Sequence, residues 1–350
     1  MKLGCHYLLS VSDQQSVVQR YRDTIEQAVL AESLGFESVW PVEHHFSRLT
    51  SALSCPALLL SAIAARTRRL RLGTAIVQLP LHHPMRVAEE IATLDVISDG
   101  RVELGVGRGS NPSHFAGYGI PLADSRERFL EALTFLRHAF AAPTFSFAGR
   151  HFQAESASLV PRPVQAPHPP IRVACNSPET LDFAAREGYP IIIATNVNPL
   201  PRVREMVPLY RAARARAGHP ASADDVTLLM PLFVAEDPAE VRRQVVPNIR
   251  QVVHGISASL LQAISRCPSL DERARLERLV TPLQKMTFES VDATGGIFDT
   301  PQRCLERIQE LRRELDPGRL ICWFNFGGLI PHDEVARSMR LFASRVMPHV

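Results

Sequence analysis

Short apolar runs alternate with longer amphipathic stretches along almost the whole chain. The apolar runs have the length of buried β-strands, and we expect strands at residues 2–9, 37–40, 70–77, 101–106, 171–175, 191–194, 226–234 and 320–324. The stretches between them repeat apolar residues at helical spacing. We expect helices at residues 14–34, 56–65, 85–97, 123–141, 178–187, 201–217, from 238 onward, 301–315 and 333–346.

Two segments interrupt this alternation. Residues 143–170 contain six prolines and a Gly149-Arg150 turn, which predicts a β-hairpin followed by an extended excursion over the surface. The pattern also weakens over residues 254–296, where we expect a charged helix near 271–283 and a loop at 293–296.

Strands that alternate with helices predict a parallel sheet. Eight such units fit a closed (β/α)8 TIM barrel of about 250 residues, and the two irregular segments account for the surplus length. We therefore expect one domain over residues 1–350, with insertions after the fourth helix and the seventh strand. An open, doubly wound sheet is the alternative fold.

Composition and charge narrow the function classes. Hydrophobic residues make up 45% and charged residues 21% of the 350 residues, which is typical of a soluble globular protein. The net charge of +3 and the pI of 8.6 lack the strong basic excess of a nucleic-acid binder. The most apolar stretch, residues 52–65, contains Pro56 and is too short to span a bilayer.

The cysteines point to a reducing compartment. They are scattered with no C-x-x-C spacing, and those within apolar runs, such as Cys175 and Cys322, are typical of small buried hydrophobic residues. The N-terminal apolar run is also too short for a signal peptide. We therefore predict a soluble, cytoplasmic protein that binds neither nucleic acid nor membrane.

Candidate catalytic residues are sought directly after each strand in the sequence, because active sites of such barrels lie at the C-terminal ends of the strands. Glu43-His44-His45 follow the second expected strand, and neighbouring residues of an extended segment point to opposite sides. One histidine can therefore face the barrel mouth while the other is buried. A general base or orienting histidine, purely structural histidines and a metal site stay open, although the spacing matches no zinc-protease motif. His82 and His83, after the third strand, are expected in a surface loop.

Two further segments suit an anionic ligand. Gly105-Val106-Gly107-Arg108-Gly109 is not the dinucleotide-binding fingerprint, but its glycines allow close backbone approach to a flat ligand and Arg108 suits an anionic group. Ser177 and Pro178 are favourable first residues of a helix, and a helix N-terminus attracts anions. Simple helix capping is the alternative. Together with Arg108, this helix start predicts a phosphate site.

These segments, in this order, resemble the bacterial luciferase-like, flavin-dependent monooxygenases, and most of all the branch of the luciferase α-subunit. The resemblance covers nearly the whole chain, and its anchors are residues 43–46, 72–75, 83–84, 97–101, 105–109, 176–178 and 300–301. It implies a (β/α)8 barrel that binds reduced FMN (FMNH2) supplied by a separate NAD(P)H:flavin reductase. In that family the reduced flavin reacts with O2 to give a C4a-peroxyflavin, which oxidises an organic substrate.

The resemblance also implies roles for individual residues. His44 would act as general base or position the flavin, and no metal would be needed. The remaining cofactor contacts would come from Glu43, Thr74, Ala75, Ile76, Gly107, Arg108, Asn176, Ser177 and Thr180. Of these, Arg108, Asn176, Ser177 and Thr180 would hold the phosphate, and the segment 74–76 would carry a non-prolyl cis peptide beneath the flavin ring. Residues 254–296 would form a mobile lid that excludes water.

The chain departs from luciferase in two places and leaves alternatives open. Gly107 stands where luciferase has a cysteine, and Asn176 where it has an acidic residue. A largely apolar substrate is favoured by apolar residues near the strand ends, namely Leu79, Leu81, Phe115, Phe324 and Phe326. A homodimer packed through the early helices is expected by family analogy. The alternatives are hydride transfer with the deazaflavin F420 and a non-catalytic partner subunit, which would not need His44.

Overall fold

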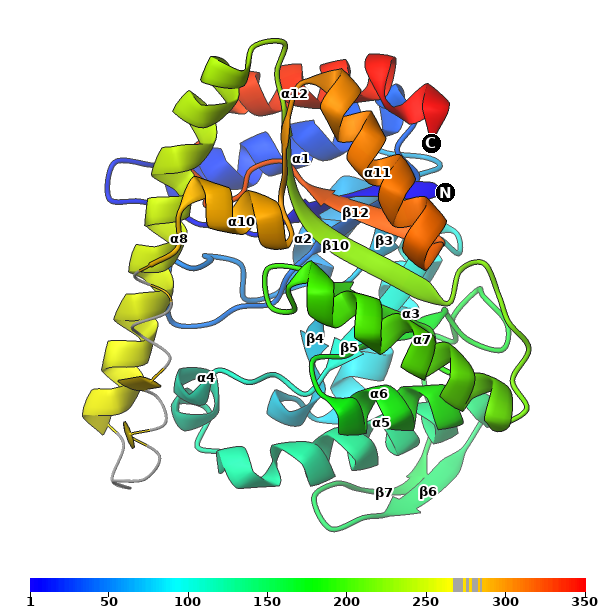
Figure 1. Ribbon diagram of the computed structural model, residues 1–350. Helices are drawn as coiled ribbons and strands as arrows, with labels where there is room; N and C mark the ends of the chain where they lie inside the picture. The colour runs from blue at the N-terminus through cyan, green and yellow to red at the C-terminus, as the bar shows by residue number, and fades with distance from the viewer. Residues whose placement is uncertain (267–272, 275–276, 279–282, 284) are drawn as a thin grey trace.

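A closed barrel of parallel strands forms the centre of the molecule. The computed structural model describes residues 1–266, 273–274, 277–278, 283 and 285–350 (Figure 1). In these residues the barrel strands are β1 (Lys2–Tyr7), β2 (Ser38–Pro41), β3 (Arg71–Gly73), β4 (Val77–Gln78), β5 (Val102–Gly107), β8 (Ile171–Ala174), β9 (Ile191–Ala194), β10 (Val226–Val234) and β12 (Arg319–Trp323). β3 and then β4 occupy the same position in the ring of strands, because both pair with β5. β10 pairs with both β9 and β12, so the ring closes. The predicted (β/α)8 barrel is confirmed.

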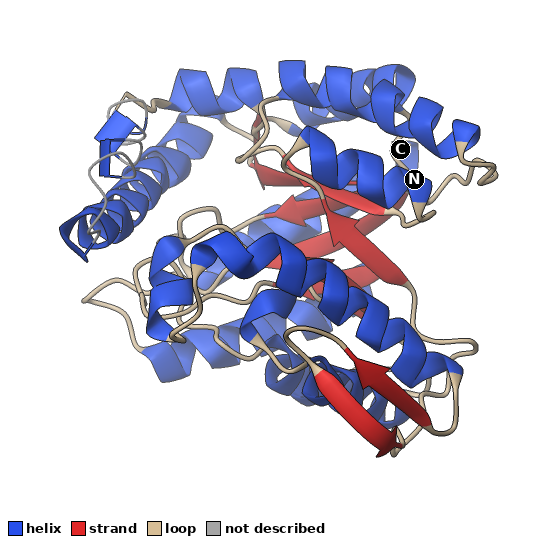
Figure 2. Ribbon diagram, turned by 90° about the horizontal axis from the view of Figure 1, so that it is seen from below, coloured by secondary structure: helices blue, strands red, loops and turns tan. Residues whose placement is uncertain are grey.

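Helices surround the strands on the outside (Figures 1 and 2). They are α1 (Val17–Leu34), α2 (Pro56–Ala64), α3 (Pro84–Ser98), α4 (Pro112–Gly117), α5 (Ser125–Ala141), α6 (Pro178–Arg186), α7 (Leu200–Arg216), α8 (Pro238–Arg266), α10 (Phe288–Thr294), α11 (Pro301–Leu315) and α12 (His332–Arg345). Gly35 ends α1 with a left-handed φ of 89°, a conformation that glycine adopts readily. The two termini lie side by side, where Met1 and Met347 border the same hollow (Figure 1).

The third strand position differs from the prediction of one strand over 70–77. Pairing stops after Gly73 and resumes at Val77. Between them, the Thr74 hydroxyl donates to the Gly105 carbonyl (2.8 Å) and accepts from the Gly105 amide (3.0 Å). The Thr74 side chain thus replaces part of the backbone hydrogen-bond ladder between these strands. An apolar run in the sequence does not reveal this substitution, because Thr is also common in strands.

The two irregular segments have different outcomes. The hairpin is confirmed as β6 (Phe145–Ala148) and β7 (Gln153–Ala157), which lie outside the helix layer (Figure 2). The pattern break expected from residue 254 is wrong in its start, because α8 continues to Arg266. α10 reaches Thr294, so the loop expected at 293–296 begins later, and β11 (Ile297–Asp299) adds a short strand beside β10. Much of the helix expected near 271–283 lies outside the described residues.

An ionic cluster fills the barrel interior near the N-terminal ends of the strands. The Glu103 carboxylate receives Arg71 (2.6 Å), Arg172 (2.9 Å) and Arg319 (3.1 Å). Arg319 is fully buried and its guanidinium lies over the Trp40 ring. Burial opposes ionisation of Glu103, but Arg319, Arg172 and Arg71 outweigh it and lower the pKa to about 2. Paired charged side chains therefore fill the barrel interior at this end.

Two further expectations concern membrane-spanning helices and buried cysteines. None of the helices in the described part of the chain is long and apolar enough to cross a membrane. Cys175 and Cys322 are buried free thiols in the barrel core, as predicted.

Candidate active site

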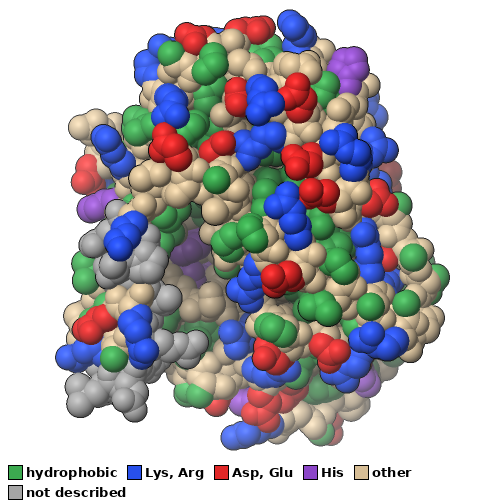
Figure 3. Space-filling view, in the orientation of Figure 1, with side chains coloured by type: hydrophobic (Ala, Val, Ile, Leu, Met, Phe, Trp, Pro, Cys, Tyr) green, Lys and Arg blue, Asp and Glu red, His purple; other side chains and the backbone are tan. Residues whose placement is uncertain are grey.

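Two cavities open at the C-terminal ends of the barrel strands. The first has a volume of about 480 Å³ and the second about 280 Å³. His44 and Val197 line both cavities, so these two residues stand between them. The surface is hollowed beside α8, and histidine side chains are visible inside the hollow (Figure 3). Candidate chemistry is thus concentrated around His44.

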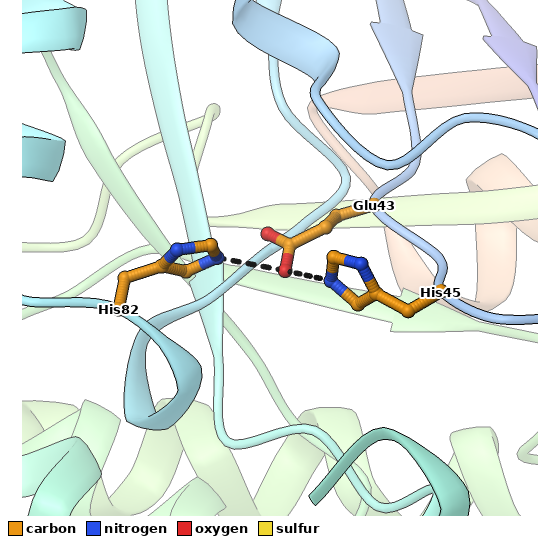
Figure 4. A group of neighbouring side chains, drawn as sticks. All are labelled: Glu43, His45 and His82. Atoms are coloured by element: carbon orange, nitrogen blue, oxygen red, sulfur yellow. Dashed lines mark hydrogen bonds and ion pairs between the residues drawn. The ribbon is translucent and has the colours of Figure 1, made fainter. Parts of the chain in front are cut away.

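Glu43 anchors one side of this site through a buried carboxylate. The Nε2–H groups of His45 and His82 donate to Glu43 Oε1 at 2.7 Å and 2.8 Å (Figure 4). The backbone N–H of Gln78 donates to the other carboxylate oxygen, Oε2, at 2.9 Å. Burial opposes ionisation, but the hydrogen bonds from both histidines outweigh it, and the pKa of Glu43 falls to about 2. The carboxylate is therefore ionised and fully used in holding its neighbours.

The same three side chains are the described group that most resembles a metal site. Their ligand atoms lie within 4.8 Å of one another. Both imidazoles, however, already donate to one carboxylate oxygen, which accounts for the arrangement without an ion. That this protein functions without a metal ion remains a prediction.

Of the two adjacent histidines, His44 borders both cavities, whereas His45 is buried and lines neither, as the extended segment predicted. The His45 backbone N–H donates to His114 Nε2 (3.3 Å), so this nitrogen carries no proton. His114 therefore donates through Nδ1 to Gln78 Oε1 (3.1 Å), and its Nε2 lone pair is shared by the His45 amide, Asn111 Nδ2 (3.2 Å) and His44 Nδ1 (3.1 Å). This network assigns the proton of His44 to Nδ1 and leaves Nε2 as an unprotonated acceptor.

Burial keeps both of these imidazoles neutral. It lowers the pKa of His44 to about 4, with a further contribution from His45. It also lowers the pKa of His114 to about 3, with His44 adding to the effect. At neutral pH the site therefore offers a neutral His44 with a free Nε2 between the two cavities.

The floor and one end of the first cavity suit a flat, anionic ligand. A Cβ on Gly107 would lie 2.3 Å from Ile76 Cδ1, so a larger residue here would have to displace the Ile76 side chain. Gly109 has a left-handed φ of 71°. Arg108 borders the cavity, is exposed and makes no ion pair with any described residue. Its guanidinium is available for an anionic group.

The N-terminus of α6 faces the same cavity. Ser177 caps this helix by accepting from the Thr180 amide (3.4 Å), so the capping interpretation is correct. Ser177, Thr180 and Asn176 nevertheless also line the first cavity. Asn176 is held from behind, because its Oδ1 accepts from Asn198 Nδ2 at 2.8 Å. The helix start and Arg108 thus converge on one cavity, as the sequence indicated.

The segment 74–76 lies between the cavities, and its residues differ in position. The peptide bond Ala75–Ile76 is cis, as the resemblance implied. Ala75 lines the second cavity and Ile76 the first. Thr74 is fully buried and lines neither, because its hydroxyl is engaged with Gly105. As cofactor contacts, these residues and the others named from the sequence stay predictions.

Sequence reasoning missed several residues of the site. His82 is partly exposed in its loop, but it also donates to Glu43, and this contact was not expected; His83 is exposed and caps α3. His114 and Gln78 were not singled out, although a histidine five residues after Gly109 was a usable signal. The apolar residues expected near the substrate line neither cavity and are buried in the core, namely Leu79, Leu81, Phe115, Phe324 and Phe326.

Comparison with known proteins gives the family. A family model described as "Luciferase-like monooxygenase" matches residues 1–316 of this chain. The chain belongs to this family. It is 26% identical to an alkanal monooxygenase alpha chain of Photorhabdus luminescens over 99% of this chain and 96% of that protein. It is 32% identical to the oxygenase component of the flavin-dependent trigonelline monooxygenase of Acinetobacter baylyi, over 51% of this chain and 49% of that protein.

Solved structures of luciferase-like proteins share the fold. The monooxygenase RslO1 from Streptomyces bottropensis superposes with a TM-score of 0.84 at 28% identity, covering 100% of this chain and 99% of that one. The oxygenating constituent of 3,6-diketocamphane monooxygenase from Pseudomonas putida, in complex with FMN, has a TM-score of 0.79 at 22% identity with the same coverage. An F420-dependent secondary alcohol dehydrogenase has a TM-score of 0.78 at 18% identity, covering 100% and 98%.

Proposed function

We propose that this luciferase-like chain is the oxygenase component of a two-component monooxygenase that uses reduced FMN and O2. The observation that carries the proposal is the position of His44. His44, with its unprotonated Nε2, lines both a cavity with anion-binding groups and a second cavity with a mainly apolar wall. A relative named as an oxygenase component supports a separate NAD(P)H:flavin reductase as the source of the reduced flavin.

The residues present fit FMN in the first cavity. Its volume of about 480 Å³ lies within the usual range for ligand pockets, about 300–1,000 Å³. Arg108, Ser177 and Thr180 would hold the phosphate, with the amides of the α6 N-terminus. Gly107 and Ile76 would border the ring. Reduced FMN, when bound, would supply two electrons to O2, of which one oxygen atom would enter the substrate and the other would leave as water.

His44 would hold or accept a proton at Nε2 beside both the cofactor and the substrate. His114 and Gln78 keep the other nitrogen protonated, so the tautomer is fixed before any ligand binds. Glu43, His45 and His82 hold the segment that carries His44 in place. α8 borders the second cavity through Val252, Gly255 and Ile256 and would limit the access of water to it.

Anaerobic titration with reduced FMN, followed by rapid mixing with oxygenated buffer, tests this proposal. We expect saturable binding and a long-lived absorbance distinct from both reduced and oxidised FMN. His44→Ala should abolish turnover and preserve FMN binding. His83→Ala is the matched control, because His83 is exposed and lines neither cavity. Unchanged turnover in His44→Ala would refute the role of His44.

The F420 alternative has its own outcome in the same experiment. Structures at 18% identity to this chain include an F420-dependent enzyme, so the fold accommodates either cofactor. Binding of reduced F420 without binding of reduced FMN would replace oxygenation by hydride transfer. Binding of neither, by a folded protein, would favour a partner subunit without catalysis.

We also propose a homodimer through the early helices. α1, α2 and α3 follow one another around the barrel and expose Val18, Leu58 and Ile97. Exposed apolar side chains on neighbouring helices favour an interface. Sedimentation should show a dimer, and Leu58→Glu should dissociate it. A stable monomer of the unaltered chain would disprove this assembly.

A further inference from the structure

The second cavity contains no charged residue among its described lining. Its wall is built from the ends of the barrel strands and from α8, and its polar groups are His6, Ser10, His44, Thr50, Asn196 and the indole N–H of Trp323. Neither an organic cation nor a carboxylate would find an opposite charge there, and burying an unpaired charge is costly. The volume of about 280 Å³ suits a compact ligand. The cavity therefore favours a small, uncharged molecule.

Beside this cavity two imidazoles offer acceptors, and the buried Trp323 indole N–H is a donor with no partner among the described residues. His6 Nδ1 lies 2.8 Å from the Trp40 carbonyl oxygen, which can only accept, so the proton of His6 is on Nδ1. His6 Nε2 then has a free lone pair and no hydrogen-bond partner in the described part of the chain. The ring is 5% exposed and packs edge-on against Trp323. Burial also lowers the pKa of His6 to about 4, which keeps the ring neutral.

Two imidazole acceptors therefore border one cavity. His44 Nε2 is unprotonated for the reason given above, and the Ser10 hydroxyl already donates to the Thr50 carbonyl at 2.7 Å. A ligand that brings only acceptors, such as a simple ketone or aldehyde, leaves His6 Nε2 unsatisfied. A ligand with an O–H group satisfies it, and an unsatisfied buried acceptor is disfavoured.

We propose that the second cavity binds an uncharged, largely apolar molecule that carries a hydroxyl group, and that His6 Nε2 accepts the hydrogen bond from this hydroxyl. This inference rests on the proposed function for the identity of the ligand as substrate. His6 is then a specificity-determining residue, which selects a hydroxylated substrate and fixes its orientation toward His44. His6 is not needed to hold FMN, because it does not line the first cavity.

Three probes of similar shape test the proposal on the flavin-free protein. They are 2-naphthol, its methyl ether and 2-naphthoate, titrated calorimetrically at pH 7, where a phenol is un-ionised. We expect 2-naphthol to bind about tenfold more tightly than the ether, which cannot donate, and 2-naphthoate to bind most weakly. Equal binding of naphthol and ether, or tighter binding of the naphthoate, would overturn the proposal.

Substitution of His6 locates the preference. His6→Phe keeps a ring of similar shape without an acceptor and should reduce the tenfold preference for 2-naphthol to less than about twofold. His6→Gln keeps an acceptor and should restore part of it, and His83→Phe is the control for a histidine outside the cavity. A full preference in a folded His6→Phe protein would refute the assignment. If that variant does not fold, the three-probe comparison and His6→Gln still decide.

The result is separable from the proposed function. The probe titrations contain no flavin, whereas the proposed function depends on reduced FMN and O2. A preference for 2-naphthol without binding of reduced FMN would keep the hydroxyl site and refute the monooxygenase. Binding of reduced FMN without a naphthol preference would do the reverse.

Discussion

At the scale of single residues, hydrogen bonding decides which nitrogen of each histidine carries the proton. The His45 backbone amide fixes His114, His114 fixes His44, and the Trp40 carbonyl fixes His6. Each imidazole is neutral because burial disfavours its charged form. The acceptor nitrogens are therefore unprotonated before a ligand binds. Loss of one hydrogen bond in the chain from His45 to His44 should change which nitrogen of the next imidazole carries the proton.

The pH dependence of turnover should report His44. Its neutral form is the one that can accept a proton, and its pKa is lowered to about 4. Turnover should therefore stay level as the pH falls from about 8 to about 5 and be lost only as the pH passes through about 4. The pH profile of kcat/KM measures this limb. A limb near the ordinary histidine value, about 6.5, would contradict the burial argument.

His114→Phe should lower turnover about tenfold and leave FMN affinity nearly unchanged. The variant removes the acceptor for His44 Nδ1–H, so His44 no longer has a fixed tautomer, and one lost hydrogen bond is worth about that factor. Steady-state kinetics and FMN titration measure the two effects. His114→Gln supplies a carbonyl acceptor and should recover part of the rate, whereas a purely structural role predicts no such recovery.

At the scale of elements, the strand ends and helix starts place chemistry that no single element holds. The end of β5 delivers Gly107 and Arg108, and the start of α6 delivers Ser177 and Thr180 to the same cavity. The short β3 and β4 leave the segment 74–76 between the two cavities. α8 buries Val241, Val245 and Ile249 at four-residue spacing in its first half, and the same helix continues to Arg266.

Arg108→Gln should weaken FMN binding by about 10- to 100-fold and leave riboflavin binding unchanged. The guanidinium would contact only the phosphate, which riboflavin lacks, and a charged hydrogen bond is worth about 1.5–3 kcal/mol. Fluorescence titration with both ligands measures the difference. An equal loss for FMN and riboflavin would place Arg108 elsewhere.

Ser177→Ala should weaken FMN binding and also cost about 1 kcal/mol of stability, because Ser177 caps α6. Ser16→Ala is the matched control, since Ser16 caps α1 far along the chain from the cavity residues and accepts from the Gln19 amide. The control should lose a similar amount of stability in urea unfolding and bind FMN normally. Weak FMN binding in both variants would indicate a general loss of structure.

At the scale of the whole molecule, closure of the barrel separates a stabilising end from a reactive end. The ionic cluster of Glu103, Arg71, Arg172 and Arg319 occupies the interior near the N-terminal ends of the strands. The two cavities open at the opposite ends of the same strands. Such barrels place their active sites at the C-terminal face, so the cluster is expected to serve stability and leave the chemistry unaffected.

Glu103→Gln should lower the free energy of unfolding at pH 7 by about 3–5 kcal/mol, because it leaves buried arginines without their carboxylate. The folded pKa of Glu103, about 2, lies below the unfolded value of about 4.3. Its contribution is therefore complete above the unfolded pKa and is lost as the pH falls toward 2. Urea unfolding at a series of pH values measures both effects. The exposed Glu306→Gln is the control and should change stability by less than about 0.5 kcal/mol.

The sequence by itself determined the order of the elements and most of their bounds. The strands at 191–194 and 226–234 and the helix at 301–315 have the predicted bounds. It also indicated Glu43-His44-His45, Arg108 and the start of α6. These features depend on near neighbours along the chain, such as apolar spacing, a capping serine or the opposite directions of adjacent side chains in an extended segment.

Only the tertiary structure decided which of these residues meet and in which protonation state. Strands far apart in the sequence bring His6, His44, His82 and His114 to one end of the barrel, and nothing local marks their contacts. Glu103 stands in an apolar strand that gives no sign of its three arginines. Hydrogen-bond partners and burial set pKa values and tautomers, and both exist only once the barrel has closed.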